Sequence, residues 1–260
     1  MSTAVLSIRN EDGIARVALA RPDVRNAFNA QLIAELQDAF NRFSADAATR
    51  AVVLSGEGKT FCGGADINWM RASLDLSRHE NVADARAMSD MFRAIDRCGK
   101  PVIGAIHGAA LGGGAGLAAV CDIVVASDET IFGFTEVKLG IIPAVISPFV
   151  LAKIGVSHAR ALFLTGERFD ARRAQAIGLV HEVTPLGALD AAVDRILAEI
   201  RSAGPGAVAA AKRLIETIRE SDYAASRDIT ADAIAAQRTT PEGQEGLRAF
   251  LERRKTEWTQ

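Results

Sequence analysis

The 260-residue chain has few cysteines, and their spacing argues against the sites that cysteines usually build. There are three, Cys62, Cys98 and Cys121, without a CxxC pair. A disulfide framework is typical of an even set in a short secreted chain, and a structural zinc site needs closely spaced ligands. We therefore expect reduced thiols in a cytoplasmic protein, with Cys62 and Cys121 acting as small hydrophobic core residues.

The sequence also has no marked excess of either charge. It contains 30 Lys and Arg against 32 Asp and Glu, a net charge of −2, which predicts no general attraction to nucleic acid or to acidic membranes. The N-terminal segment MSTAVLSIRNEDG lacks a basic stretch followed by a long apolar one, so no signal peptide is expected. With 49% hydrophobic and 24% charged residues, the composition is typical of a folded domain with a sizeable core.

One apolar run is long enough to suggest a membrane helix. From Pro101 to Cys121 the only conventionally polar side chain is that of His107. Six glycines interrupt this run: Gly104, Gly108, Gly112, Gly113, Gly114 and Gly116. They disfavour one continuous helix, although membrane helices tolerate glycine. We interpret the run as a buried strand that contains His107 as a core residue, then a tight glycine turn and a buried helix.

Short strands alternate with helical segments in the first half of the chain. The expected strands form a hairpin over residues 5–19 and then lie at 51–56, 100–108, 122–127 and 130–134. Helical spacing of apolar residues over 32–40, and a polar helical stretch over 80–97, complete the pattern. This alternation predicts an α/β core.

From residue 147 onward the sequence is almost entirely helical in pattern. We expect a core over residues 1–203 and a helical C-terminal lobe over 204–260, divided by the breaker Gly204–Pro205–Gly206. The helices would bury their apolar faces on each other or on a neighbouring subunit.

Two glycine turns are candidates for ligand binding: Cys62–Asp66 and Leu111–Gly116. Glycine lets the backbone take tight conformations and lets a ligand approach the main chain. If a helix begins at each turn, free backbone N–H groups converge there and stabilise a developing oxyanion. The alternatives are ordinary strand-to-helix turns or a dinucleotide-binding fingerprint, whose glycine spacing differs.

Three longer stretches carry a family resemblance: FCGGADI (61–67), KPVIGAIHGAALGGGAGLAAVCDIVVAS (100–127) and FGFTEVKLGIIPA (132–144). In this order they resemble the enoyl-CoA hydratase/isomerase family, the crotonase superfamily. The resemblance implies an α/β spiral of β-β-α units with a helical C-terminal region. It also implies an acyl-CoA thioester substrate, a homotrimer or a hexamer of two trimers, and no metal or cofactor beyond the CoA of the substrate.

The resemblance also implies roles for individual residues. Ala65 and Gly113 would bind the thioester oxygen through their backbone N–H groups, and Glu136 would move protons. Further substrate contacts would come from Arg25, Ala27, Gly64, Asp66, Ile67 and Gly112. Asp66 and Ile67 would line the CoA region and Arg25 would contact a phosphate. A solvated surface arginine is the alternative for Arg25.

One position departs from the two-glutamate hydratases of this family, which carry their first glutamate two residues after the glycine triplet. That position is Gly116 here, so Glu136 would act alone. Its neighbours Phe132 and Phe134 predict partial burial, which would raise its pKa and improve it as a proton shuttle. Glu80 is a candidate second acid or base that would position water. Its alternative role is an acidic residue that stabilises a helix N-terminus.

A hydratase is favoured because the run GIIPAVISPFVLAKIG (140–155), together with Gly116, resembles the bacterial methylglutaconyl-CoA and branched enoyl-CoA hydratases. A remote carboxylate on the substrate would need a basic partner, with Arg71, Arg86 and Lys138 as candidates. The alternatives are an enoyl-CoA delta-isomerase with Glu136 as its single shuttle, a non-catalytic acyl-CoA-binding protein and a thioesterase-like hydrolase.

Overall fold

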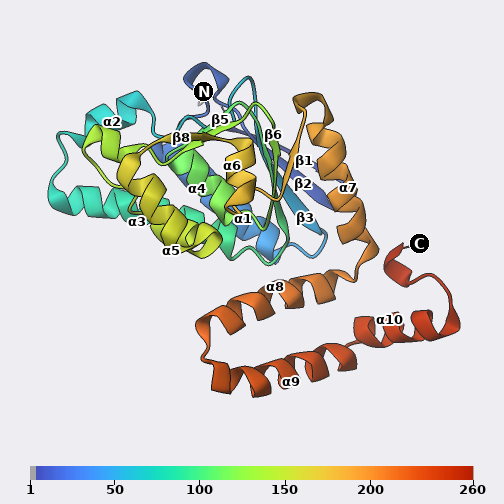
Figure 1. The fold of residues 1–260 in the computed structure, drawn as a ribbon. Helices are drawn as coiled ribbons and strands as arrows, with labels where there is room; N and C mark the ends of the chain where they lie inside the picture. The colour runs from blue at the N-terminus through green and yellow to red at the C-terminus, as the bar shows by residue number, and fades with distance from the viewer. Residues whose placement is uncertain (1–3, 260) are drawn as a thin grey trace.

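Two β-sheets form the centre of the protein, and helices cover them (Figure 1). The structure is a computed structural model that describes residues 4–259. Residues 1–3 and Gln260, which belong to the expected core and lobe, lie outside the described residues. The larger sheet has the order β1-β2-β3-β4-β6-β9 and contains β1 (Leu6–Glu11), β2 (Ile14–Leu19), β3 (Ala51–Gly56), β4 (Val102–Ile106), β6 (Ile123–Ser127) and β9 (Glu182–Thr184).

The first two strands form the predicted hairpin. β1 and β2 pair in antiparallel register, with Glu11 opposite Ile14, and the other neighbours in this sheet are parallel. Asp12 and Gly13 make the turn with φ values of 48° and 76°. Because glycine adopts positive φ without steric cost and aspartate tolerates it, these residue types suit the turn. The hairpin prediction over residues 5–19 is confirmed.

A smaller sheet has the order β5-β7-β8 and consists of β5 (Ala109–Leu111), β7 (Ile131–Gly133) and β8 (Arg168–Asp170). β5 lies where the sequence predicted only a glycine turn, and β8 and β9 were not predicted. Strands of three residues are too short to show an alternating pattern. The prediction of one strand over 100–108 was too long, because β4 ends at Ile106.

His107 therefore does not lie inside a buried strand, as the sequence suggested. It follows β4, is half-buried, and its Nε2 atom lies 3.0 Å from the carbonyl oxygen of Gly58. The chain leaves the larger sheet at this point. Gly108 takes a φ of 65° and packs against Lys59, which a residue with a side chain would not permit. His107 is thus a satisfied polar residue at the end of a strand.

The helices of the core lie on both sides of the sheets (Figure 1). They are α1 (Ala30–Ala45), α2 (Ile67–Ser73), α3 (Arg78–Asp96), α4 (Gly113–Val120), α5 (Ser147–Thr165), α6 (Ala171–Ala176) and α7 (Leu189–Ser202). Short 3-10 helices occur at η1 (Pro22–Val24), η2 (Glu136–Leu139), η3 (Leu186–Ala188) and η4 (Glu257–Thr259). The predicted helical segments over 32–40 and 80–97 are confirmed as parts of α1 and α3.

The glycine-rich apolar run forms β4, β5 and α4. Its residues are apolar because α4 is buried along nearly its whole length between the sheets and the outer helices. Within residues 4–259, no helix combines the length and the apolar character needed to cross a membrane. The predicted strand, glycine turn and buried helix are confirmed, except that the strand ends before His107 and the short strand β5 precedes the turn.

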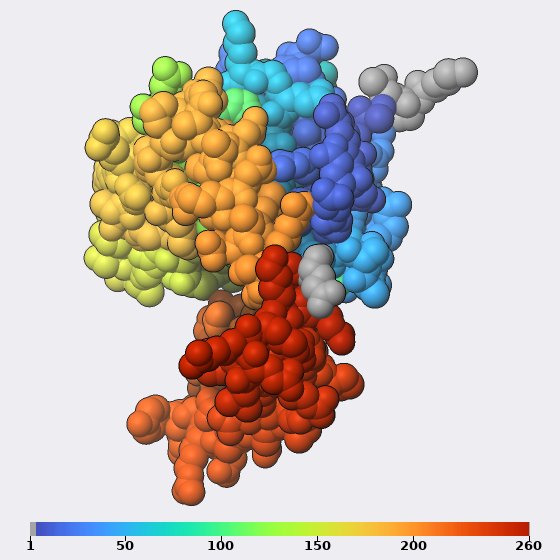
Figure 2. Space-filling model, turned by 90° about the vertical axis from the view of Figure 1, so that its right-hand side faces the viewer, coloured from blue at the N-terminus to red at the C-terminus, as the bar shows by residue number. Residues whose placement is uncertain are grey.

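The last three long helices project away from the sheets as a separate arm (Figures 1 and 2). They are α8 (Pro205–Glu220), α9 (Tyr223–Thr239) and α10 (Pro241–Glu252). Pro205 occupies the first turn of α8, where a missing N–H costs nothing. The described residues of α8 and α9 include none that is buried, and α10 buries Ala249. The arm therefore has little core of its own.

Candidate active site

The first glycine turn is held by a short backbone pairing with Phe28. The N–H of Phe28 donates to the carbonyl of Gly64 at 2.8 Å, and the carbonyl of Phe28 accepts from the N–H of Asp66 at 2.9 Å. In such a parallel bridge, the N–H of the intervening residue, Ala65, points away from Phe28. Ala65 lines a cavity, described below, so its N–H is available to a ligand there.

The side chain of Asp66 also holds the first glycine turn in place. It is buried, its carboxylate caps α2 by accepting from the N–H of Asn68 at 2.8 Å, and it accepts from Arg21 Nη2 at 2.8 Å. Burial would raise the pKa of Asp66, but the hydrogen bonds from Arg21 and Asn68 and the charge of Arg21 hold it below its ordinary value. Arg21 also donates to the carbonyl of Ala27. Asp66 and Ala27 thus support the turn and are not among the residues that line the cavity, and their predicted contacts with the CoA substrate remain a prediction.

The second glycine turn runs beside the first. The N–H of Cys62 donates to the carbonyl of Ala109, and the N–H of Leu111 donates to the carbonyl of Cys62, both at 3.0 Å. A Cβ at Gly64, whose φ is 98°, would lie 3.0 Å from the carbonyl oxygen of Leu111. The glycine therefore permits this close approach of the two turns.

α4 begins at Gly113, directly after Gly112 with its φ of 53°. The N–H of the first residue of a helix has no partner within the helix. Gly113 and Ala65 belong to two paired turns, and both line the cavity. This arrangement suits a carbonyl oxygen that gains negative charge.

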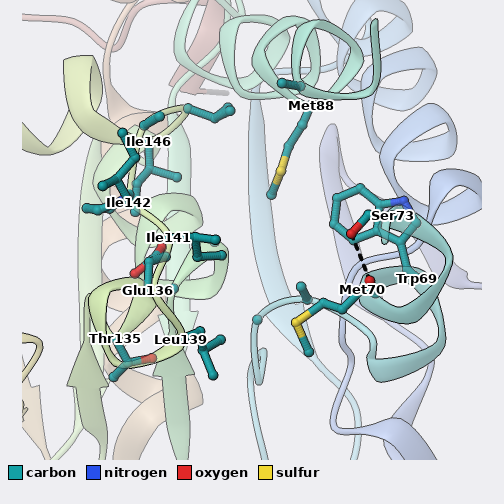
Figure 3. Close-up of a pocket in the computed structure, with 18 of the residues that line it drawn as sticks. Trp69, Met70, Ser73, Met88, Thr135, Glu136, Leu139, Ile141, Ile142 and Ile146 are labelled. Carbon is teal, nitrogen blue, oxygen red and sulfur yellow. Dashed lines mark hydrogen bonds between the residues drawn. The ribbon is translucent and has the colours of Figure 1, made fainter. Parts of the chain in front are cut away.

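The cavity next to these turns has a volume of about 700 Å³. Figure 3 shows two walls. Trp69, Met70, Ser73 and Met88 form one wall and belong to α2 and α3, while Thr135, Glu136, Leu139, Ile141, Ile142 and Ile146 form the other. Most of the lining is apolar, as expected for a site that takes up a hydrocarbon chain.

Glu136 is the first residue of η2 and is half-buried in the cavity wall. A Cβ at Gly112 would lie 3.3 Å from its Oε1 atom, so the carboxylate is close to the second turn. Its Oε2 atom is buried and has no hydrogen-bond partner among residues 4–259. Burial raises the pKa of Glu136, against a smaller lowering by its own backbone N–H. The predicted partial burial beside Phe132 and Phe134, both buried, is confirmed.

Gly116 lies inside α4 and faces Ile146 and Phe92 rather than open space. Glu80, the predicted candidate for a second acid or base, lies elsewhere. It is exposed at the start of α3, where its Oε2 atom accepts from the Ser77 N–H at 2.8 Å and from Ser77 Oγ at 2.6 Å. These bonds form a capping box and lower the pKa of Glu80. Glu80 does not line the cavity, so its alternative role at a helix N-terminus is the one observed.

The remaining predicted residues divide between the cavity and the surface. Gly64, Ala65, Gly112, Gly113 and Glu136 line the cavity together. Arg25 is exposed beside the first turn with a φ of 55°, and Ile67 is 68% exposed at the start of α2, so neither lines it.

The other predicted cations and thiols also lie outside the cavity. Arg71, Arg86 and Lys138 are exposed and do not line it. Cys62 and Cys121 are buried, and burial raises the pKa of each thiol to about 12, as expected for core residues.

The sequence analysis missed several residues of the α2 and α3 wall. Trp69, Asp84 and Met88 all line the cavity. Burial raises the pKa of Asp84, against the lowering effect of a side-chain hydrogen bond with Trp69. The helical spacing of 84 and 88 could have placed them on one face of α3, but nothing in the sequence indicated that this face meets the glycine turns. Within residues 4–259 no group of three His, Cys, Asp or Glu side chains is arranged to hold a metal ion.

Comparison with known proteins gives consistent matches over nearly the whole chain. The family model described as enoyl-CoA hydratase/isomerase matches residues 9–260. The crotonyl-CoA hydratase of Syntrophomonas wolfei is 34% identical over 250 residues, which cover 95% of each chain. The crystal structure of an enoyl-CoA hydratase from Shewanella pealeana superposes with a TM-score of 0.94 and 36% identity, over 98% of this chain and 96% of that one. AtuE of Pseudomonas aeruginosa superposes with a TM-score of 0.96 and 34% identity, over 99% and 100%. The predicted α/β spiral with a helical C-terminal region is confirmed.

Proposed function

The chain belongs to the enoyl-CoA hydratase/isomerase family, and from this membership and its cavity we propose that it is an enoyl-CoA hydratase with Glu136 as its acid–base residue. As a hydro-lyase it would add water across the 2,3 double bond of an enoyl-CoA thioester. The observation that carries the proposal is the buried, unpartnered Oε2 atom of Glu136, which lines the same cavity as the two backbone N–H donors. A carboxylate oxygen in that setting is ready to accept a proton.

The thioester oxygen binds between the N–H groups of Ala65 and Gly113. These donors polarise the conjugated system and stabilise the enolate that forms when C3 is attacked. Glu136 removes a proton from a water molecule while the oxygen of that water bonds to C3. The electrons of the double bond move toward the thioester oxygen. Glu136 then returns the proton to C2, which restores the thioester carbonyl. One carboxylate thus performs both proton transfers.

The test follows loss of the conjugated enoyl-thioester absorbance with crotonyl-CoA. Wild type is expected to hydrate it, and Glu136→Gln to lose at least about 100-fold in kcat/KM, the usual scale for removal of a general base. Glu129→Gln is the matched control, because Glu129 is exposed and does not line the cavity. No hydration by wild type would disprove the proposal, and full activity of Glu136→Gln would mean that another group is the base.

An isomerase is the second candidate, and Gly116 is the observation that favours it. With no carboxylate at that position, Glu136 as a single shuttle suits proton transfer between C2 and C4 of a 3-enoyl-CoA. Formation of the conjugated 2-enoyl thioester from a 3-enoyl-CoA, without later hydration, would support the isomerase. Tight thioester binding without turnover, unchanged in Glu136→Gln, would instead support a non-catalytic acyl-CoA-binding protein. Release of free CoA thiol would reveal a thioesterase.

For the acyl group we propose a short branched chain. Ile141, Ile142, Val145 and Ile146 give the cavity a broad aliphatic wall, which supports this choice. A substrate like 3-methylglutaconyl-CoA stands second, because its remote carboxylate would need a cation. A rate higher on 3-methyl-2-pentenoyl-CoA than on crotonyl-CoA would support the branched chain, and the reverse order would argue against it.

For the assembly we propose a homotrimer or a hexamer of two trimers, with residues 204–260 as a lobe that packs on a neighbouring subunit. The arm exposes large apolar side chains: Ile215, Tyr223, Ile234, Leu247, Phe250 and Leu251. An arm with few buried residues and these exposed apolar side chains is suited to packing on a neighbouring subunit. Light scattering during size-exclusion chromatography would test the proposal, and a stable monomer would contradict it.

For the location we propose the cytoplasm. The free, buried thiols of Cys62, Cys98 and Cys121 support this proposal, because such thiols persist in a reducing compartment. Cell fractionation would test it, and recovery outside the cytoplasm would contradict it.

A further inference from the structure

One face of α3 forms the wall of the cavity opposite Glu136. Asn81, Asp84, Ala85 and Met88 all line the cavity and recur at helical spacing. Asp84 is half-buried and is the carboxylate that α3 contributes to the described lining. The reaction derived above assigns it no role.

Trp69 is a neighbour of this carboxylate in the cavity wall. It belongs to α2, which begins directly after the first glycine turn, and its ring is partly buried against the hydrophobic core. Burial raises the pKa of Asp84, and an interaction with the Trp69 side chain partly offsets this. The indole carries no charge, so it does not neutralise the carboxylate, and Asp84 places a negative group in the wall.

The charged residues of the described lining are both acidic, Asp84 and Glu136. No Lys, Arg or His is found among the lining residues that the structure describes. The cations closest in sequence, Arg71, Arg86 and Lys138, are exposed outside it. A carboxylate on a bound acyl chain would therefore meet two like charges and no counter-charge in the cavity wall.

Asp84 and Met88 lie at different positions along α3, and this separates Asp84 from the place where the reacting carbons would bind. Met88 marks the thioester end, because its Cε atom would lie 2.9 Å from a Cβ at Gly113. Asp84 is one helical turn before Met88, roughly 6 Å along the helix axis. That separation resembles the span from the thioester carbon to the far end of a five-carbon acyl chain. Asp84 is thus suited to act on the distal group and not on the double bond.

We propose that Asp84 is a specificity-determining residue that excludes acyl chains ending in a carboxylate and restricts the enzyme to uncharged enoyl-CoA substrates. The inference rests on the proposed hydratase function and names its substrate class. Repulsion of a wrong substrate by an unpaired like charge is a common route to specificity.

The test compares two substrates with the same carbon skeleton, 3-methylglutaconyl-CoA and 3-methyl-2-pentenoyl-CoA, in which a methyl group replaces the carboxylate. Wild type is expected to prefer the neutral substrate. In Asp84→Asn the ratio of kcat/KM for the charged over the neutral substrate should rise at least about tenfold, since close like charges cost several kcal/mol. Asp84→Glu keeps the charge and should keep the wild-type preference.

Asp90→Asn is the matched control, because Asp90 is an exposed residue of α3 outside the cavity lining, and its ratio should equal that of wild type. An unchanged ratio in Asp84→Asn, or a wild-type preference for the charged substrate, would overturn the inference. Calorimetric binding of 3-methylglutaryl-CoA and 3-methylpentanoyl-CoA gives the same comparison without turnover. If wild type hydrates nothing, the proposed function fails, and the ratio of these two affinities in wild type and Asp84→Asn still decides the role of Asp84.

Discussion

The side chain of Ile146 fills the space into which any side chain at position 116 would project. A Cβ built on Gly116 would lie 2.3 Å from Ile146 Cγ2, 3.0 Å from Ile146 Cβ and 3.1 Å from Phe92 Cζ. Ile146 is itself 2% exposed and also lines the cavity. The absence of a carboxylate at position 116 is therefore built into the packing of α4.

Gly116→Ala should destabilise the protein, although alanine normally favours a helix over glycine. The added methyl group would overpack the contact with Ile146, and we expect a loss of about 1–3 kcal/mol in the free energy of unfolding. Denaturant unfolding would measure it. Gly187→Ala is the control, because a Cβ there has no neighbour within 4 Å, and it should be close to neutral. If the clash is the cause, adding Ile146→Ala to Gly116→Ala should cost less than the sum of the single changes.

Glu136→Gln should make the protein more stable while removing activity. Burial raises the pKa of Glu136, so the ionised carboxylate favours the unfolded chain and stability falls as the pH rises through the folded-state pKa. We expect Glu136→Gln to unfold at a higher temperature near neutral pH, with a gain of roughly 1 kcal/mol for removing a buried, unpaired charge. The gain should disappear below the ordinary glutamate pKa of 4.5. An equal gain at all pH values would contradict the titration as its cause.

The pH dependence of hydration should report the same group. In the proposed mechanism Glu136 acts first as a base, so its carboxyl group must be deprotonated in the free enzyme. Because the pKa of Glu136 is raised, the acidic limb of kcat/KM should lie above the ordinary glutamate value of 4.5. The acidic limb should persist in Asp84→Asn, measured as kcat/KM on the neutral substrate over the same pH range. A limb that disappears in that variant would assign the titration to Asp84 instead.

Arg21→Met should damage both stability and turnover. The change leaves Asp66 buried without its cation, and removing one partner of a buried ion pair typically costs about 3–5 kcal/mol. Since Arg21 helps to lower the pKa of Asp66, the wild-type pair stabilises the fold above the ordinary pKa of 3.8 and loses this contribution as the pH falls. Denaturant unfolding at neutral and acidic pH would measure the loss, which should be largest at neutral pH.

Arg16→Met is the control for that change. Arg16 pairs with Asp194 at 2.6 Å on the surface, where ion pairs contribute about 0–1 kcal/mol. Arg21→Lys, which keeps the charge, should fall between Arg21→Met and wild type. Similar losses in Arg16→Met and Arg21→Met would mean that burial of the pair is not what matters. A fall in kcat/KM of Arg21→Met alone would link the pair to the position of Ala65.

The sequence by itself was sufficient for the features that neighbours along the chain determine. The hairpin follows from alternating apolar residues around Asp12 and Gly13, and α1 follows from an apolar stripe at helical spacing. The burial of Glu136 follows from the phenylalanines beside it. The two glycine turns could be predicted because glycine tolerates backbone conformations that other residues disfavour, so clustered glycines indicate where the chain turns.

Only the tertiary structure decided which distant residues meet. Arg21 reaches Asp66 across 45 positions, Trp69 and Asp84 line the same cavity, and Ile146 closes the space at Gly116. An amphipathic pattern shows which face of a helix is buried but not which residue will face it, because that depends on how the sheets and helices pack. For the same reason, the sequence could not predict that the α3 wall is acidic. Asp84 becomes part of a site only because α3 lies across the cavity from Glu136.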